Sequence, residues 1–452
     1  MLLYNRFVDV TKIFHRNLLP LLGVLLSSVA YFQLAQLEDR ADSFELLIFC
    51  SLAFVGLGCL LRSRLSFTIL LLLGLLFRFF FWNYIPELSQ DFYRFLWDGQ
   101  LQVLGINPYA YTPETLLKEI QTPFLRELYQ GMGPLSQQHY SNYPPASQLL
   151  FYLAAQLGAN NLLMQLGILR FSLLLGDLLA LFAIRKILQY YQLPLESAFL
   201  YFLNPLLLIE GVGNLHGEGL MLAATAWGVW FYTQKRWGPS AAFFAAGVAV
   251  KLLPLLWLPL LLPSLNWKDR GQLVGLGLLF SLLFWGPYIG PEWWDHYRQS
   301  LQLWFSNFEF NASIYYAIRE WGYQQTGYNI IRKLGKISPW VITGLALLFP
   351  FWPQGKSKTQ KWSLALGLLS IYYMLSTTVH PWYLIHLVFL SVLTPYRYAL
   401  LWSYTVLFSY WAYASPAVVE PWWLVWVEYL PVYGLLLYET LVKKRLRASV
   451  GC

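Results

Sequence analysis

An all-α, polytopic integral membrane protein with about twelve transmembrane helices is expected from three features of this chain. Of its 452 residues, 57% are hydrophobic and only 12% are charged, whereas soluble domains carry about a quarter charged residues. Apolar runs close to the ~20 residues that cross a bilayer recur from Leu18 to Leu441. The chain also has 21 Trp and 31 Tyr, residues that are typical of membrane interfaces. We expect one transmembrane domain over 1–452.

The orientation of the spans follows from the basic residues in the short loops. Arg62 and Arg64 separate the second and third apolar runs, which predicts a cytoplasmic turn there. The segment 83–145 then forms a first large outer loop, and 289–336 forms a second. Spans are expected at about 18–37, 44–61, 65–82, 162–184, 195–212, 217–233, 271–288, 337–353, 362–379, 381–394, 398–414 and 422–440, with both termini and the basic tail Lys443–Arg447 inside.

Two apolar segments are harder to place. Residues 146–157 are short for a span, and we expect a helix at the interface, because the following run then ends inside at Arg185 and Lys186. Residues 241–263 contain Lys251 and three prolines and have basic residues near both ends. A broken or re-entrant helix is expected, and such backbone is tolerated where it lines a cavity. A different interpretation of either segment changes the number of spans.

The net charge of +8 requires no nucleic-acid partner, because the basic residues lie in short loops and the tail, where they orient a membrane protein. Three cysteines are too few for a disulfide framework.

The stretch from Ser89 to Pro113 follows an apolar run and concentrates polar groups. If Asp91 to Gln102 is helical, Asp91, Arg94 and Asp98 share one face. Gly105 and Asn107-Pro108 then end the helix. A surface helix held by an Arg94–Asp98 pair is the alternative to a functional site.

Three further polar clusters fall on the predicted outer side: Tyr143-Pro144-Pro145, Glu210 with Asn214 to Glu218, and His380 to Tyr383. Any one histidine there could be an interface anchor, but the chain has only six histidines. Lys251 lies in an apolar run, where an ammonium costs about 2.5–3.5 kcal/mol on insertion scales. It therefore faces a cavity or partner, or it snorkels from the span edge. Arg170 and Asp177 are expected to form a buried structural pair.

Glycosyl transfer from a lipid phosphate would use such a set of residues. A carboxylate accepts the proton of the acceptor hydroxyl, and Asp91 suits that role. Cationic groups stabilise the charge that grows on the departing phosphate, and Arg94, Lys251 and His380 are candidates. The aromatic-rich helices would hold the lipid tail. A single base implies direct displacement and inversion at the anomeric carbon.

Six motifs in this order resemble a known family: SQDFYRFLWDG, GINPYAYTP, SNYPPASQLL, NLHGEGL, VAVKLLPLLWLPLLL and HPWYLIHL. Together they resemble the polyprenol-phosphate-mannose-dependent mannosyltransferase-like group of the GT-C superfamily of integral-membrane glycosyltransferases. The acidic loop is also similar to the first mannosyltransferase of the glycosylphosphatidylinositol pathway. The resemblance covers about residues 83–395. It departs from the family at Gln90, where relatives carry a second acidic residue, and at Glu218, where they have Asp.

The resemblance implies an acidic base in the first outer loop, which here is Asp91. It also implies a polyprenyl-phosphate-sugar donor, a lipid or glycan acceptor, and a reaction on the extracytoplasmic side of the inner (plasma) membrane. Mannose is the leading sugar. No cofactor is expected, with a divalent metal left open. The candidate donor-phosphate and substrate-binding residues are Arg94, Asp98, Asn107, Tyr109, Tyr143, His216, Glu218, Lys251, His380, Trp382 and Tyr383.

The main alternative is a transporter or flippase of lipid-linked sugars, which would also use broken helices and an intramembrane lysine. The lack of an inverted repeat and the concentration of carboxylates in an outer loop argue against it. A membrane scaffold or a protein similar to an O-antigen polymerase is a third possibility.

Overall fold

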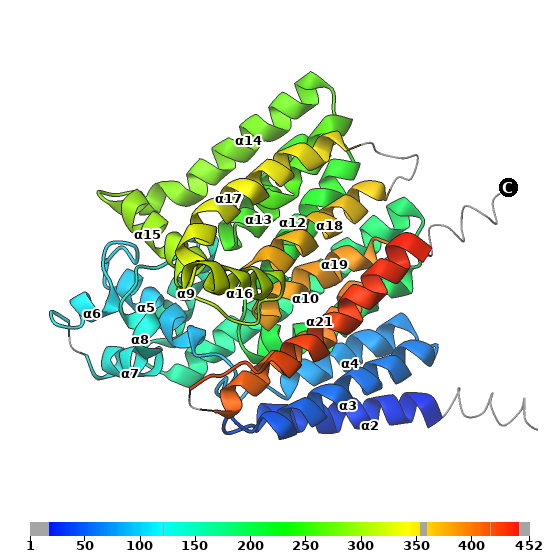
Figure 1. Cartoon of the computed structure of the whole chain (residues 1–452), viewed down its shortest axis with the longest axis horizontal. Helices are drawn as coiled ribbons and strands as arrows, with labels where there is room; N and C mark the ends of the chain where they lie inside the picture. Colours follow the sequence, from blue (N-terminus) through cyan, green and yellow to red (C-terminus); the bar gives the residue numbers. More distant parts are fainter. Residues whose placement is uncertain (1–17, 121, 353–358, 416, 443–452) are drawn as a thin grey trace, which may run out of the picture.

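The computed structural model describes residues 18–120, 122–352, 359–415 and 417–442. Within these ranges the regular structure is helical, and the only pairing of extended backbone is an isolated bridge between Phe310 and Thr378. The all-α class is thus confirmed. Figure 1 shows long helices running side by side, with a group of short helices gathered near one end, at the left of the view. The basic tail Lys443–Arg447 lies outside the described residues.

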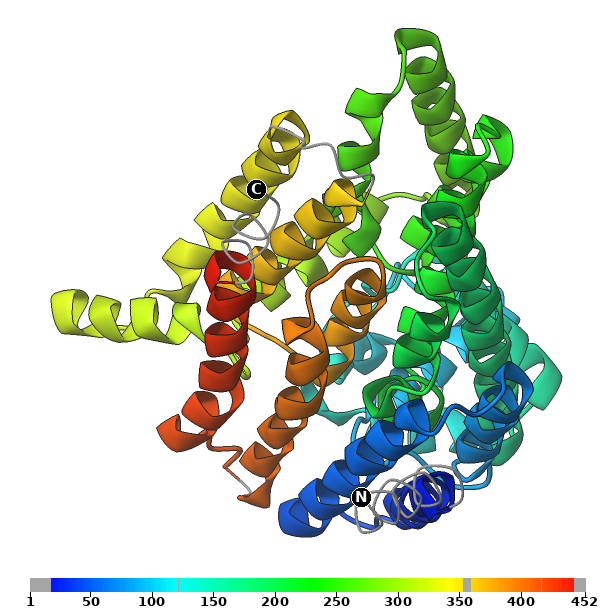
Figure 2. The ribbon, with the colours of Figure 1, turned by 90° about the vertical axis from the view of Figure 1, so that its right-hand side faces the viewer.

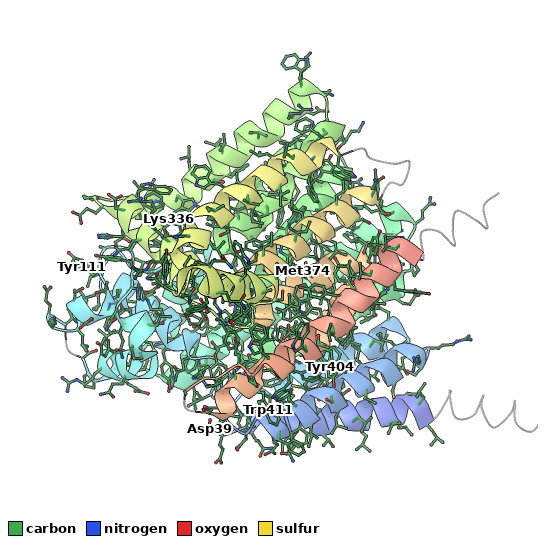
Figure 3. The ribbon with its side chains drawn as sticks, viewed as in Figure 1. Asp39, Tyr111, Lys336, Met374, Tyr404 and Trp411 are labelled. Atoms are coloured by element: carbon green, nitrogen blue, oxygen red, sulfur yellow. The ribbon has the colours of Figure 1, made fainter. Side chains whose placement is uncertain are left out.

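The N-terminal part consists of α2 (Leu19–Ala35), α3 (Ser43–Arg62) and α4 (Phe67–Phe79). They coincide with the first three expected spans. α3 ends at Arg62, where the basic turn was predicted. The α2–α3 hairpin packs against the C-terminal part of the chain, where the hydroxyls of Ser51 and Tyr404 share a hydrogen bond of 2.8 Å. Figure 2 shows these two ends of the chain as neighbours, and Figure 3 labels Tyr404 beside the hairpin.

The first outer loop folds into short helices: α5 (Asp91–Val103), α6 (Pro113–Leu116), α7 (Pro123–Gly131), α8 (Gly133–Gln137) and, beyond it, α9 (Pro145–Gly158). Proline in the first turn suits a helix start because its missing N–H has no partner there. The threonines before α6 and α7 accept backbone N–H groups as caps. α5 packs on α9 through Phe95 and Phe151, whose rings stack at 4.6 Å. A second hydrophobic core forms here, beside the main one.

The middle of the chain contains one long helix and two interrupted ones. α10 (Leu162–Tyr191) has 30 residues and continues beyond the expected basic pair Arg185 and Lys186 to Tyr191. Next, η2 and α11 (Leu195–Phe202) bend by 58° against η3 (Leu207–Gly213). After α12 (Glu218–Thr233), α13 (Trp237–Val250) stops at Lys251, whose backbone is extended, and 3₁₀ turns η4 (Leu253–Leu256) and η5 (Leu258–Ser264) follow. The broken helix expected at 241–263 is confirmed.

The second half of the chain returns across the molecule several times. Its helices are α14 (Trp267–Trp285), α15 (Trp293–Ser306), α16 (Ile314–Thr326), α17 (Ile331–Leu348), α18 (Gln360–Leu375), η8 with α19 (Pro381–Val392), α20 (Tyr398–Thr405), η9 (Val406–Ala414) and α21 (Trp422–Leu437). Helices α15 and α16 occupy the second expected outer loop. Figure 1 places α15 near the short helices of the first loop.

Four described helices are long and apolar enough to cross a membrane, or five if the bent pair counts as one span. The protein is therefore a membrane protein. Four shorter apolar helices, among them α2 and α13, fall below the length of a span. Prolines and 3₁₀ turns cut several expected spans into pieces, since proline removes a helix hydrogen bond. The number of about twelve stays a prediction.

One predicted ion pair is wrong. Asp177 on α10 pairs with Arg78 of α4, at 2.8 Å between Nε and Oδ2, and both side chains are buried. Arg170 instead donates to backbone carbonyls, including those of Trp82 and Tyr84. The spacing of Arg170 and Asp177 on one helix could not reveal these partners, because they come from segments distant in sequence.

Candidate active site

A cavity of about 690 Å³ opens where the irregular backbone segments meet. The start of α5, the loop before α9, the turn before α12, the break at Lys251 and the turn before η8 all contribute to its wall. Non-helical backbone at membrane depth is tolerated where it is buried in protein or lines a cavity. Eight of the twelve candidate residues line it: Asp91, Tyr143, His216, Glu218, Lys251, His380, Trp382 and Tyr383.

Asp91 is the first residue of α5, and its side chain is 36% exposed, toward the cavity. Its Oδ2 lies 3.8 Å from Nε2 of His216, which is an ion-pair distance but too long for a hydrogen bond. Burial opposes ionisation, but the neighbouring His216 outweighs it and lowers the pKa of Asp91. The N-terminus of α5 also favours a negative charge. Asp91 is therefore an ionised carboxylate at neutral pH, which can accept a proton.

His216 lies in the turn between η3 and α12. Burial favours the neutral ring, but the carboxylates of Asp91 and Glu210 outweigh it and raise the pKa of His216 to about 9. The imidazole stacks on Trp382 with ring centres 3.7 Å apart, and Trp382 stacks on His380 at 4.3 Å. Burial lowers the pKa of His380 to about 3, so His380 is neutral. The three rings thus form a stacked aromatic column in the cavity wall.

Lys251 reaches the cavity from the break after α13. Its ammonium pairs with Glu218, the first residue of α12, and the lysine side chain is 25% exposed against 2% for the glutamate. Lys251 thus faces a cavity and a partner and does not snorkel. The extended backbone at this residue turns its side chain out of the helix. A cation on the cavity wall is suited to an anionic group of a ligand.

Four other candidates from the first loop lie away from the cavity lining. Arg94 and Asp98 form a buried pair at 2.7 Å, so the pair expected on a surface helix exists but inside the protein. Asn107 donates to the carbonyl of Tyr288 at 2.8 Å, and the Tyr109 hydroxyl donates to the carbonyl of Tyr143 at 2.5 Å. These side chains hold the loops that position Asp91 and Tyr143.

Asp98→Asn is expected to destabilise the fold rather than the chemistry. The carboxylate of Asp98 is fully buried and accepts hydrogen bonds from Arg94, Ser141 and Gln148. Removing the charge leaves a buried guanidinium unpaired, which costs about 3–5 kcal/mol. Thermal unfolding in detergent should show a large fall in Tm, with the exposed Glu114→Gln as the control. Lost activity at unchanged Tm would instead place Asp98 in the reaction.

Arg40 and Tyr410 are among the cavity-lining residues that were not predicted. Arg40, between α2 and α3, lines the cavity, and its guanidinium lies 4.2 Å from the ring centre of Tyr413. Tyr410 of η9 also lines it and donates to Glu210 at 2.6 Å. Arg40 lies in an ordinary polar turn and Tyr410 in an aromatic run, so no local sequence pattern indicated that either lines a cavity. Among the described residues, no three His, Cys, Asp or Glu side chains group as metal ligands.

Comparisons with known proteins agree with the motifs. Residues 47–266 match the family model described as the N-terminal domain of alpha-(1->6)-mannopyranosyltransferase. Over 178 residues the chain is 27% identical to alpha-(1->6)-mannopyranosyltransferase A of Mycobacterium tuberculosis. The aligned stretch covers 39% of this chain and 33% of that protein. No solved structure matches the chain. The resemblance to GT-C mannosyltransferases is confirmed, and the matched segment contains Asp91, His216, Glu218 and Lys251.

Proposed function

We propose that this mannosyltransferase-like protein moves a hexose, with mannose as the leading sugar, from a polyprenyl-phosphate-linked donor to a lipid or glycan acceptor. The reaction inverts the anomeric carbon, with Asp91 as general base, and takes place on the extracytoplasmic side of the inner membrane. The observation that carries the proposal is that the ionised Asp91 and the cation of Lys251 line the same cavity. The similarity to mannopyranosyltransferases supports the sugar.

The proposed step is a direct displacement. The acceptor hydroxyl gives its proton to a carboxylate oxygen of Asp91 as its oxygen forms a bond to the anomeric carbon. The bond from that carbon to the phosphate oxygen breaks, and the polyprenyl phosphate leaves with the electron pair. Lys251 stabilises the negative charge that gathers on this oxygen. A phosphate leaves without protonation, so a general acid is not required.

The shape and lining of the cavity support a lipid-linked donor. Its volume lies within the roughly 300–1,000 Å³ of small-molecule sites. Its wall also contains many apolar side chains, among them Leu150, Leu169, Leu173, Leu253 and Ile342. Such a wall is suited to the first isoprene units next to the phosphate, since burying apolar surface is favourable.

The transporter alternative has one observation in its favour, the break of α13 at Lys251, because broken helices with a charged residue are typical of transporter binding sites. The same break serves an enzyme equally well. The similarity to transferases and the position of Asp91 on a short loop helix favour transfer.

A transfer assay tests the proposal. The purified protein in liposomes receives radiolabelled polyprenyl-phosphate-mannose and a membrane extract as acceptor. We expect the label to move to a new product with wild type and not with Asp91→Asn. If glucose, galactose and arabinose donors also yield no product while labelled donor crosses the bilayer, the transporter function is correct.

A further inference from the structure

Glu210 is a fully buried carboxylate on η3 whose contacts lead toward Asp91. Its Oε1 accepts a hydrogen bond of 2.6 Å from the hydroxyl of Tyr410. Its Oε2 accepts from the Asn214 amide at 3.3 Å and lies 3.3 Å from Nδ1 of His216. Among the described residues, no Lys or Arg lies within 4.0 Å of this carboxylate. His216 is therefore the partner that can carry a positive charge.

The backbone also directs His216. The Glu210 carbonyl accepts from the His216 backbone N–H at 3.0 Å and lies 3.1 Å from the ring Nδ1. Leu215, just before His216, has a φ of +65°. This is a left-handed backbone conformation that residues other than glycine rarely adopt. Together with the stack on Trp382, these constraints leave one ring edge, Nε2, facing Asp91. That atom is buried and has no hydrogen-bond partner among the described residues.

The charges around His216 come from several elements. Asp91 of α5, Glu210 of η3 and Glu218 of α12 favour the protonated ring. Lys251, at the end of α13, and His380, before η8, are the basic groups nearby, and the charge of Lys251 is offset by its pair with Glu218. A protonated His216 between two carboxylates is thus the balanced state of the site.

We propose that Glu210 is a positioning residue, which holds the protonated ring of His216 against Asp91 and so keeps the base ionised and directed into the cavity. The proposal rests on the proposed transferase function. It assigns a purpose to a buried carboxylate that is not part of the cavity lining. The chain of contacts also ties the catalytic loop to η9 near the other end of the sequence, through Tyr410.

The test compares pH profiles of kcat for wild type and Glu210→Gln. The glutamine keeps the volume and removes the negative charge. In wild type, His216 is charged below a pH of about 9 and loses its proton above it, so activity should fall on that alkaline side. Losing the negative charge 3.3 Å from Nδ1 should move the alkaline fall in activity down by about one to two pH units, with donor KM unchanged.

Glu428→Gln is the matched control, because Glu428 is equally buried, is hydrogen-bonded to Trp402 and Asn311, and does not line the cavity. In this variant, the fall of kcat at alkaline pH should stay at the wild-type position. An unchanged alkaline fall in Glu210→Gln, or an equal loss of kcat at every pH, would overturn the proposal.

A second measurement needs no sugar transfer. NMR of the protein with ¹³C-labelled histidine, with the His216 signal assigned by its loss in His216→Gln, gives the titration of His216 directly. A midpoint well above the ordinary value of about 6.5 supports the Glu210–His216–Asp91 arrangement. A midpoint at or below that value overturns it. Failure of the transfer assay alone would count against the proposed function and leave this titration intact.

Discussion

Asp91→Asn is expected to lower kcat for the proposed sugar transfer by about 10²–10⁴-fold, the contribution typical of a positioned general base. Asparagine keeps the size of the side chain at the start of α5, but its amide does not accept the acceptor's proton. Asp91 lies at the cavity wall rather than in a buried network, so the substitution leaves the fold in place. Donor binding should be retained.

Turnover and equilibrium binding of labelled donor, measured on the same preparation, separate these two effects. Asp295→Asn is a suitable control, because Asp295 lies on α15 with a side chain 72% exposed and is not part of the cavity lining. Wild-type turnover in Asp91→Asn would remove Asp91 from the role of base. A parallel loss of donor binding would assign it to substrate recognition instead.

Lys251→Met is expected to raise the donor KM about ten- to hundredfold. A hydrogen bond from a charged group contributes roughly 1.5–3 kcal/mol, and every 1.4 kcal/mol is a factor of about ten in affinity. Lys251→Arg keeps the charge and should have a smaller effect. A shorter donor without its isoprene tail should show the same loss, because the proposed contact of Lys251 is with the phosphate.

The single variant also leaves the Glu218 carboxylate buried without its partner, which costs about 3–5 kcal/mol of stability if it stays ionised. The double variant Lys251→Met with Glu218→Gln removes both charges and avoids this penalty. We expect it to recover the wild-type Tm while the donor KM stays high. An unchanged donor KM in the double variant would show that Lys251 serves only to balance Glu218.

Several site residues could be predicted because they break a local rule. Lys251 interrupts an apolar run, where a charge carries a cost that a membrane protein accepts for a reason, and Asp91 opens a polar stretch soon after another apolar run. This reasoning did not reveal where the neighbours of Asp91 lie. Arg94 and Asp98 share its motif and its expected helix face, yet they turn into a core beside Ser141 and Gln148, where they hold the loops together.

The pairing of charges was beyond local patterns for a related reason. Asp177 is seven residues from Arg170 on one helix, but its partner is Arg78, on another helix 99 residues away. Likewise, Glu210 is six residues before His216 in the sequence, but the hydroxyl that donates a hydrogen bond to its carboxylate belongs to Tyr410, 200 residues later. Contacts of this range depend on how helices pack, which periodicity does not encode.

By itself, the sequence determined the helical class, the membrane location, the break at Lys251 and the resemblance to mannosyltransferases, because hydropathy, proline and short motifs act over a few turns of helix. Only the tertiary structure decided which polar side chains share one cavity, which are buried as supports, and that His216 lies between Asp91 and Glu210. The physical reason is that charges act through space over a few ångströms, and folding brings together residues that the chain keeps hundreds of positions apart.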